Sequence, residues 1–423
     1  MIKKFAALLA MVFVASTLST GTVSGQFSTA RYIAPTAPTN IPVYDTAWQM
    51  FVLSSPQQAD EYFRTLRDFG FTGAWSALAH HAPATIADPF HGGGTVANFD
   101  AQGNIVFTPE YIAHVRTILD AADRYGMKVG VVAAWQNLYL PGGRSDDGHP
   151  RSDTVRGTLT TANSYNYGVQ MVEAFGDHPA ISAWVFGGDA GSNNTVANVQ
   201  VWRNMAAGVH DAGSTIDITY HTPSAFFDHL TYVGEEWLDF ISPETGHNTT
   251  PQEIQDQLII AGREYQLPVW QGEPRYFNLN FEWVVERFRN PQVSDVEADA
   301  IAARNAGVAG YLYGDAGRWN WCGGFGDSTP CDRNNISASF GAGEQAVINV
   351  FRGTAPNLPT TTTPPPPPTT TTTLPAPSYD DPGLATSLGE AACWFNNHPL
   401  ANQCGPQSRR LDIGPSAGSF LLR

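Results

Sequence analysis

Long apolar runs, cysteines and positive charges are all scarce in this 423-residue sequence. Only Phe5 to Ala15 forms a continuous apolar core, and it is shorter than the ~20 residues that a membrane-spanning helix needs. With Lys3 and Lys4 before it and small residues up to Gly25 after it, this stretch is typical of an export signal. We therefore expect a secreted, extracellular protein without a membrane partner, whose mature chain begins near Gln26.

The shortage of basic residues makes nucleic acid an unlikely partner. The chain has 23 Lys and Arg against 39 Asp and Glu, a net charge of -16. Removing residues 1–25, with Lys3 and Lys4, changes this to about -18. Such a surface repels phosphate backbones and anionic lipid headgroups. We expect a protein that binds neither nucleic acid nor membranes and is monomeric.

The four cysteines form two close pairs, Cys322 with Cys331 and Cys393 with Cys404. Three connectivities are formally possible. Export to an oxidising compartment favours two local disulfides. Neither spacing is CxxC, and no two histidines have the HxxxH or HxH spacing of a metal site, so we expect no metal or other cofactor.

Several catalytic motifs are also missing. The sequence contains no GxSxG elbow, which argues against a Ser-His-Asp hydrolase. The glycine-rich stretch from His91 to Gly94 is not followed by Lys-Ser/Thr, so it does not form a phosphate-binding loop.

Composition divides the chain into five parts. Residues 1–25 are the expected signal peptide and 26–40 an irregular N-terminal arm. Residues 41–353 carry the regular secondary structure, and 354–377 are nearly all Thr and Pro, as in an extended polyproline II spacer. The tail, 378–423, is too small for a large core and holds one predicted disulfide. It is either a small glycan-binding or wall-binding module or a partly disordered appendage.

Eight short apolar runs alternate with helix-like stretches between residues 41 and 353. The runs are expected near 43–48, 72–77, 128–135, 181–186, 216–220, 238–242, 269–272 and 309–313. Helices are expected near 55–70, 109–125, 165–175, 196–212, 251–265, 295–305 and 344–351. Alternating strands and helices indicate a parallel sheet covered by helices, and eight units in about 310 residues indicate an α/β fold of the (β/α)8 TIM barrel type.

Two of the apolar runs end in a carboxylate, at Asp189 and at Glu273. The active site of a (β/α)8 barrel lies at the carboxyl ends of its strands. Acids at the ends of the fourth and seventh strands would face each other across the mouth. One carboxylic acid and one carboxylate are what hydrolysis of a glycosidic bond requires. The sequence therefore predicts a glycoside hydrolase, with carbohydrate as its substrate and Asp189 and Glu273 as catalytic residues.

Both acids have a structural alternative. Asp189 could cap the turn or the helix that follows it. Glu273 could be a buried ion-pair partner of Arg275 or Arg304. The glycines before Asp189 and the setting of Glu273 between Gly272 and Pro274 favour functional roles, because glycine lets the backbone approach a ligand closely.

Other polar and aromatic side chains follow the predicted strands and are candidates for substrate binding. Asp45 is either an orienting second carboxylate or a hydrogen-bond anchor of the first loop. The histidines are expected to donate to substrate or to the catalytic acids, and each tryptophan could instead pack a loop. The predicted substrate-binding residues are Asp45, Trp48, Trp75, Trp135, His221, His247, Tyr313 and Trp319. Glu244 lies at the end of the sixth strand, and the sequence assigns it no role.

Motifs spread along the barrel resemble those of the apiosidase-like glycoside hydrolases. They include Tyr44 to Trp48, Phe175 to Pro179 leading to Trp184 to Asp189, Thr219 to His221, Gly246-His247, Gly272 to Pro274 and Gly310 to Gly314, in family order. The resemblance implies a (β/α)8 enzyme in which Asp189 is the acid/base and Glu273 the nucleophile of a retaining mechanism. The chain departs from the family in having Tyr44 where glycine is usual and Ser-Pro-Glu244-Thr where a Gln-Ser pair is usual.

A non-catalytic glycan-binding or cell-wall-binding protein on the same scaffold is the main alternative. Both would have an aromatic cleft, but only the enzyme needs two apposed acids. The sequence does not specify the sugar, the linkage or endo against exo action.

Overall fold

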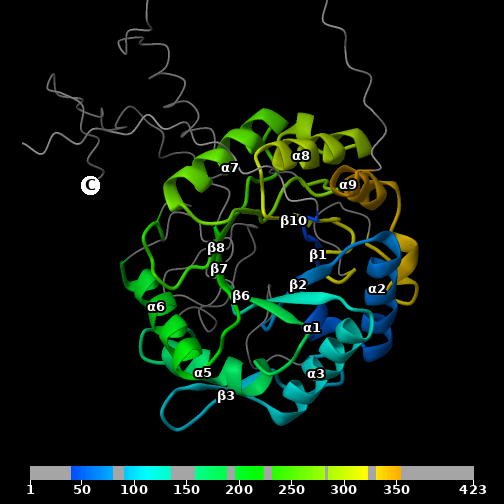
Figure 1. The fold of residues 1–423 in the computed structure, drawn as a ribbon. Helices are drawn as coiled ribbons and strands as arrows, with labels where there is room; N and C mark the ends of the chain where they lie inside the picture. Colours follow the sequence, from blue (N-terminus) through cyan, green and yellow to red (C-terminus); the bar gives the residue numbers. More distant parts are fainter. Residues whose placement is uncertain are drawn as a thin grey trace, which may run out of the picture. The chain divides into compact units, whose positions relative to one another are not determined.

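The computed structural model describes residues 40–79, 90–134, 158–187, 196–222, 231–281, 284–322 and 330–353. Eight strands in this part of the chain form one sheet, and every neighbouring pair is parallel (Figure 1). They are β1 (Val43–Thr46), β2 (Gly73–Ala77), β5 (Lys128–Val132), β6 (Ile181–Gly187), β7 (Ile218–Thr222), β8 (Phe240–Pro243), β9 (Trp270–Gln271) and β10 (Gly310–Tyr313).

The sheet closes on itself between β8 and β9, the two ends of the strand order β8-β7-β6-β5-β2-β1-β10-β9. The Ile241 amide donates to Pro268 O at 3.0 Å, and the Gly272 amide donates to Pro243 O at 2.9 Å. A further parallel bridge joins Glu244 to Glu273. These contacts complete the (β/α)8 barrel that the sequence predicts.

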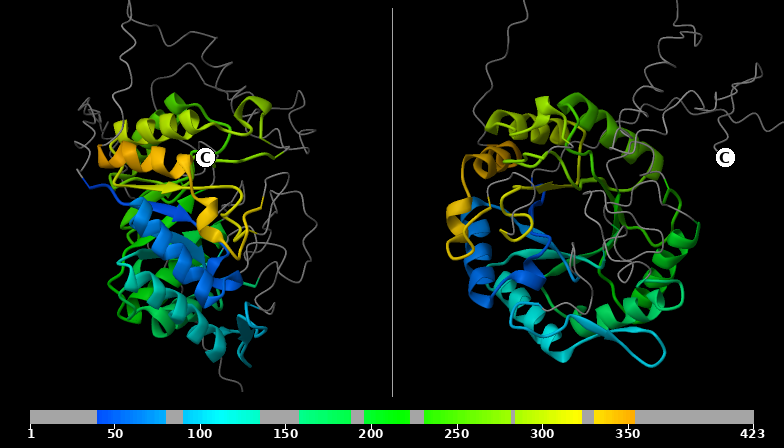
Figure 2. Two further views of the ribbon diagram at one scale, coloured as in Figure 1. Left: turned by 90° about the vertical axis from the view of Figure 1, so that its right-hand side faces the viewer. Right: turned by 180° about the vertical axis from the view of Figure 1, so that it is seen from behind.

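Helices form a ring outside the strands, seen from both ends of the barrel in Figures 1 and 2. Three begin at a hydroxyl cap followed by proline, at Ser55, Thr108 and Thr250, and each cap oxygen accepts a backbone N–H three residues on. The α-helices are α1 (Met50–Leu53), α2 (Pro56–Phe69), α3 (Pro109–Arg124), α5 (Ser164–Phe175), α6 (Val196–Asp211), α7 (Pro251–Tyr265), α8 (Val293–Asn305) and α9 (Ala342–Arg352), with 3-10 turns η2 (Glu286–Phe288) and η3 (Ile336–Ser339).

Two features differ from the predicted alternation. An antiparallel hairpin, β3 (Ala97–Phe99) with β4 (Ile105–Phe107), lies between the run expected near 72–77 and the helix expected near 109–125, where no strand was predicted. Phe107 packs on the rings of Tyr111 and Tyr167, and this contact fixes the hairpin against the helices that carry these tyrosines. Between β7 and β8, residues 231–239 form turns and contain no helix.

Large aromatic side chains fill the barrel interior. Trp75 stacks on Trp270 with ring centroids 6.3 Å apart, and Tyr44 meets Trp270 edge-on at 5.2 Å. Trp75 is fully buried and also contacts His221, at 5.8 Å between centroids. Trp75 therefore packs against His221 inside the barrel and has no exposed surface for a substrate.

Cys322 and Cys331 form the predicted disulfide, which closes a loop after β10. The other predicted pair, Cys393 and Cys404, lies outside the described residues. None of the helices described here combines the length and apolarity needed to cross a bilayer.

Candidate active site

Glu273 is the second residue after β9, and Gly272, between the strand and Glu273, allows it to lie there. A Cβ atom at position 272 would lie 2.4 Å from the carbonyl oxygen of Ser242 and 2.9 Å from His221 Nδ1. Only glycine therefore lets β9 approach β8 and the imidazole this closely. The Glu273 side chain is placed next to His221 as a result.

Two histidines contact the Glu273 carboxylate. His247 Nε2 lies 2.9 Å from Oε1, and His221 Nε2 lies 3.4 Å from Oε2. Burial alone would raise the pKa of Glu273, but these interactions lower it to about 2. Glu273 is therefore a carboxylate at neutral pH, although it is only 7% exposed.

A second buried carboxylate, Glu244, shares His221 with Glu273. His221 Nε2 lies 3.0 Å from Glu244 Oε1, closer than it lies to Glu273. Burial would lower the pKa of His221, but the charges of Glu244 and Glu273 raise it to about 10. The imidazole is thus a cation held between two anions.

Aromatic rings surround the other side of Glu273. Trp48 Nε1 donates to the Tyr276 hydroxyl at 3.0 Å, and the Tyr276 ring meets the His247 ring edge-on at 4.7 Å. Trp319 lies 6.1 Å from Tyr276 between centroids. Burial first, and then the charge of Glu273, raise the pKa of Tyr276 well above its ordinary value. Tyr276 therefore keeps its proton and links the tryptophans to the carboxylate.

His221, Glu244 and Glu273 also have the residue types of a metal-binding group. Their ligand atoms all lie within 4.8 Å of one another. His221 Nε2 also contacts both carboxylates directly, at 3.0 and 3.4 Å. In the structure these side chains form an ion-pair cluster, and the same three side chains have the chemistry of metal ligands.

Neither arginine proposed as an ion-pair partner of Glu273 is directed to it. Arg275 forms a two-point pair with Asp299, at 2.8 and 2.7 Å, and Arg304 donates to Val350 O at 2.9 Å. The described partners of Glu273 are histidines and not arginines. This favours a functional role for Glu273 over that of a structural ion-pair partner.

Asp45 and Tyr313 lie in a different layer, between the barrel wall and helices α2 and α9. They are partners in the β1–β10 register. The Asp45 carboxylate accepts from Arg318, at 3.0 and 3.2 Å, and from Tyr62 of α2 at 2.8 Å. A Cβ on Gly343 of α9 would lie 2.6 Å from the Tyr313 hydroxyl. Both side chains are thus buried away from Glu273.

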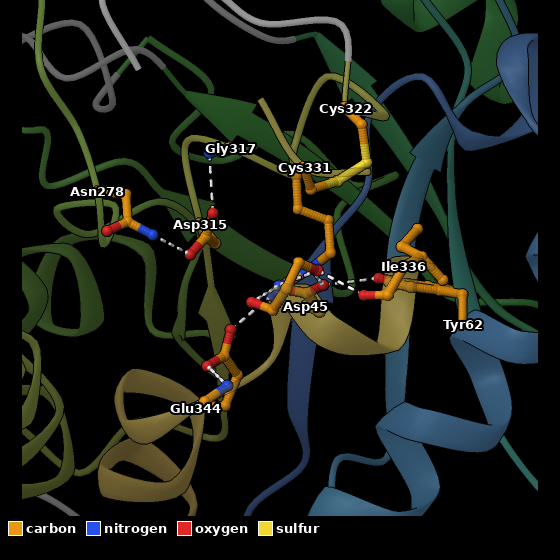
Figure 3. A network of polar contacts seen from close by, with 12 residues as sticks. Asp45, Tyr62, Asn278, Asp315, Gly317, Cys322, Cys331, Ile336 and Glu344 are labelled. Atoms are coloured by element: carbon orange, nitrogen blue, oxygen red, sulfur yellow. Dashed lines mark hydrogen bonds and ion pairs between the residues drawn. A yellow bond between two sulfur atoms is a disulfide. The ribbon is translucent and has the colours of Figure 1, made fainter. Parts of the chain in front are cut away.

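Arg318 is the centre of this second cluster, and Figure 3 shows its partners Asp45 and Glu344 in close-up. Its guanidinium also donates to Glu344 of α9 at 2.8 Å. Nearby, Asp315 accepts from Asn278 Nδ2 and from the Gly317 amide, both at 2.8 Å. The cluster therefore ties the segment after β10, which carries Trp319, to β1, α9 and the segment after β9.

The structure thus brings together five of the predicted site residues. These are Glu273, His221, His247, Trp48 and Trp319, with Trp75 packed below. Asp189 and Trp135 lie outside the described residues, so the predicted acid pair has one described member. Glu244 and Tyr276 belong to the group around Glu273, but the sequence predicted no role for either of them. Glu244 could have been found from its place at a strand end, whereas Tyr276 has no such signal.

Comparisons with known proteins agree with this fold. The family "Apiosidase-like, catalytic domain" matches residues 41–331. No curated protein is similar enough in sequence to count as a match. The solved structures similar to this chain include a glycoside hydrolase family 5 protein from Bacteroides vulgatus, with 19% identity, a TM-score of 0.53 and coverage of 72% of this chain and 65% of that one.

Two further structures have the same fold. One is titled "Glycoside hydrolase", with 18% identity, a TM-score of 0.58 and coverage of 73% of this chain and 69% of that one. The other is a Bacteroidetes-affiliated family 5 cellulase, with 12% identity, a TM-score of 0.52 and coverage of 75% and 93%. This chain spans less than two thirds of the length of the Bacteroides vulgatus structure. The family match covers most of the barrel, and the chain belongs to the apiosidase-like glycoside hydrolases, with residues 41–331 as its catalytic domain.

Proposed function

We propose that this protein cleaves O-glycosidic bonds in a plant or microbial polysaccharide or oligosaccharide with retention of anomeric configuration. The observation that carries the proposal is the state of Glu273, which follows a barrel strand and is kept ionised by His221 and His247. An ionised carboxylate at the carboxyl end of a strand is what nucleophilic attack on an anomeric carbon requires.

In the first step, a Glu273 oxygen attacks the anomeric carbon and the bond to the leaving oxygen breaks. Asp189 gives its proton to that oxygen, and a glycosyl ester on Glu273 remains. In the second step, Asp189 takes a proton from water, the water oxygen attacks the anomeric carbon, and the ester bond to Glu273 breaks. Both residues return to their starting states.

Aromatic side chains near Glu273 supply surfaces for sugar C–H groups. Trp319, 7% exposed, and His247, whose side chain is 11% exposed, are the described candidates for substrate contact. Trp135 is a further candidate from its position in the sequence.

We also propose that the protein acts outside the cell as a monomer. The basic and apolar character of residues 1–25 supports export. The disulfide between Cys322 and Cys331 suits an oxidising compartment. Residues 354–377 would then space the catalytic barrel from the tail.

The direct test is sugar release from a panel of plant and microbial glycans by wild type and by Glu273→Gln. Glu264→Gln is a matched control, because Glu264 lies on α7 with a 41% exposed side chain paired to Arg263. We expect wild type and the control to release sugar, and Glu273→Gln to bind glycan with release lowered by about 10³-fold or more. Binding without release by wild type on the whole panel would instead favour the glycan-binding alternative.

A further inference from the structure

A third carboxylate, Glu244, lies beside the proposed nucleophile and has no part in the two chemical steps. Its backbone is fixed on both sides. The Glu244 amide donates to Thr222 O at the end of β7, and the next amide, of Thr245, donates to Glu273 O, both at 3.1 Å. Because Glu244 is only 6% exposed, its charge needs a partner inside the protein.

That partner is His221, which is completely buried. The rings of Trp48 and Trp75 lie 5.5 and 5.8 Å from the imidazole, between centroids, and restrict its rotation. Nε2 is directed at both carboxylates, at 3.0 Å from Glu244 and 3.4 Å from Glu273. Removing the charge of Glu244 would therefore alter the contact between His221 and Glu273.

We propose that Glu244 is a positioning residue that acts through His221: it holds the imidazole as a cation, and so fixes the orientation and charge of the Glu273 carboxylate. The proposal rests on the proposed role of Glu273 as nucleophile. It assigns Glu244 no contact with substrate.

The charges around His221 support this role. Among the described residues, the ionisable groups in contact with the imidazole include Glu244 and Glu273, and beyond Glu273 lie His247 and Tyr276. Burial lowers the pKa of His221, and with one carboxylate alone only a single anion would raise it. The second anion keeps the ring protonated, and a protonated ring gives a stronger hydrogen bond to the nucleophile than a neutral one.

The experiment compares wild type, Glu244→Gln, Glu244→Asp and the exposed control Glu264→Gln. Glutamine keeps an acceptor oxygen but removes the charge, whereas aspartate keeps the charge on a shorter side chain. The kinetic constants are measured on whichever glycan wild type cleaves. The His221 imidazole is titrated by NMR of the ¹⁵N-histidine-labelled protein, with His221→Gln used to assign its signal.

For Glu244→Gln we expect kcat to fall about 10- to 100-fold, because the nucleophile is less well oriented. We expect KM to stay within about threefold, because Glu244 does not touch substrate. The pKa of His221 should fall by about one unit or more. Glu244→Asp should keep more of kcat than Glu244→Gln, and Glu264→Gln should match wild type in all three measurements.

An unchanged kcat and an unchanged His221 titration in folded Glu244→Gln would overturn the proposal. So would a rise in KM at constant kcat, since that would mean a direct contact with substrate. If Glu244→Gln does not fold by circular dichroism, Glu244→Met, which is uncharged and close in size, takes its place with the same expected results and the same overturning results. A wild type that cleaves no glycan would instead contradict the proposed function itself.

Discussion

His247 Nε2 lies 2.9 Å from Glu273 Oε1, a hydrogen bond that favours the ionised carboxylate. His247 comes from the segment after β8, and the backbone of the same segment is joined to Glu273, because the Gly246 amide donates to Glu273 O at 3.1 Å. The nucleophile and its donor are thus positioned by one short piece of chain.

Replacing His247 by alanine should raise the pKa of Glu273. Glu273 has a lowered pKa, so its ionised form is present above that value and is lost as the pH falls through it. Without His247 the loss begins at a higher pH, and the acidic limb of the kcat/KM profile should move up by about one pH unit. His210→Ala, at an exposed position on α6, is the control. An acidic limb that does not move would show that His247 does not set the ionisation of Glu273.

Replacing Gly272 by alanine should reduce both stability and activity. The new methyl group would lie 2.4 Å from Ser242 O, which belongs to backbone, so β8 and β9 must separate. We expect about 2 kcal/mol lower free energy of unfolding in urea, typical of overpacking at a buried site. Gly341→Ala is a suitable control, since Gly341 has a φ of -165° and no atom near the added Cβ. Equal stability of the two variants would contradict the close approach described for Gly272.

Replacing Arg318 by methionine should be strongly destabilising. Asp45 and Glu344, both almost fully buried, would lose the cation that lies between them. Removing one partner of a buried ion-pair group costs about 3–5 kcal/mol. Denaturant unfolding of Arg318→Met and of Arg263→Met, whose arginine side chain is 57% exposed, measures the difference. If Arg318→Met lowers the free energy of unfolding no more than Arg263→Met does, the cluster does not stabilise the barrel.

Metal chelation should leave activity unchanged. The proposed steps use only Asp189, Glu273 and water, and His221 Nε2 contacts Glu244 and Glu273 directly, at 3.0 and 3.4 Å. Rates before and after dialysis against EDTA, and after addition of Zn²⁺ or Ca²⁺, provide the measurement. A loss of activity in EDTA that one of these ions restores would assign the group as a metal site instead.

The barrel itself was predictable from the sequence because each unit carries a local signal. Ser55 and Thr250 cap helices with proline at the first turn, and the strands are short apolar runs. The β3–β4 hairpin was missed because each of its strands has three residues, and it is held by Phe107 packing on distant rings.

Gly272-Glu273 is a position where a glycine near the strand end pointed to a carboxylate that the structure places beside two histidines. Asp45 and Tyr313 show the limit of that reasoning. Successive side chains of a strand point to opposite faces, so a polar residue at a strand end can lie in the helix layer as easily as at the mouth. Glu244 and Tyr276 were not assigned roles because their contacts depend on the closure of β8 against β9 and on segments beyond the strands.

The most direct test of the central claim is the separation of the Asp189 and Glu273 carboxyl groups in a crystal structure of the enzyme with a bound sugar. A retaining pair should lie about 5 to 5.5 Å apart on opposite sides of the scissile bond. A separation of about 6.5 to 9.5 Å would mean inversion and would contradict the role of Glu273 as nucleophile. A larger separation, or an Asp189 directed away from the sugar, would contradict the acid pair altogether.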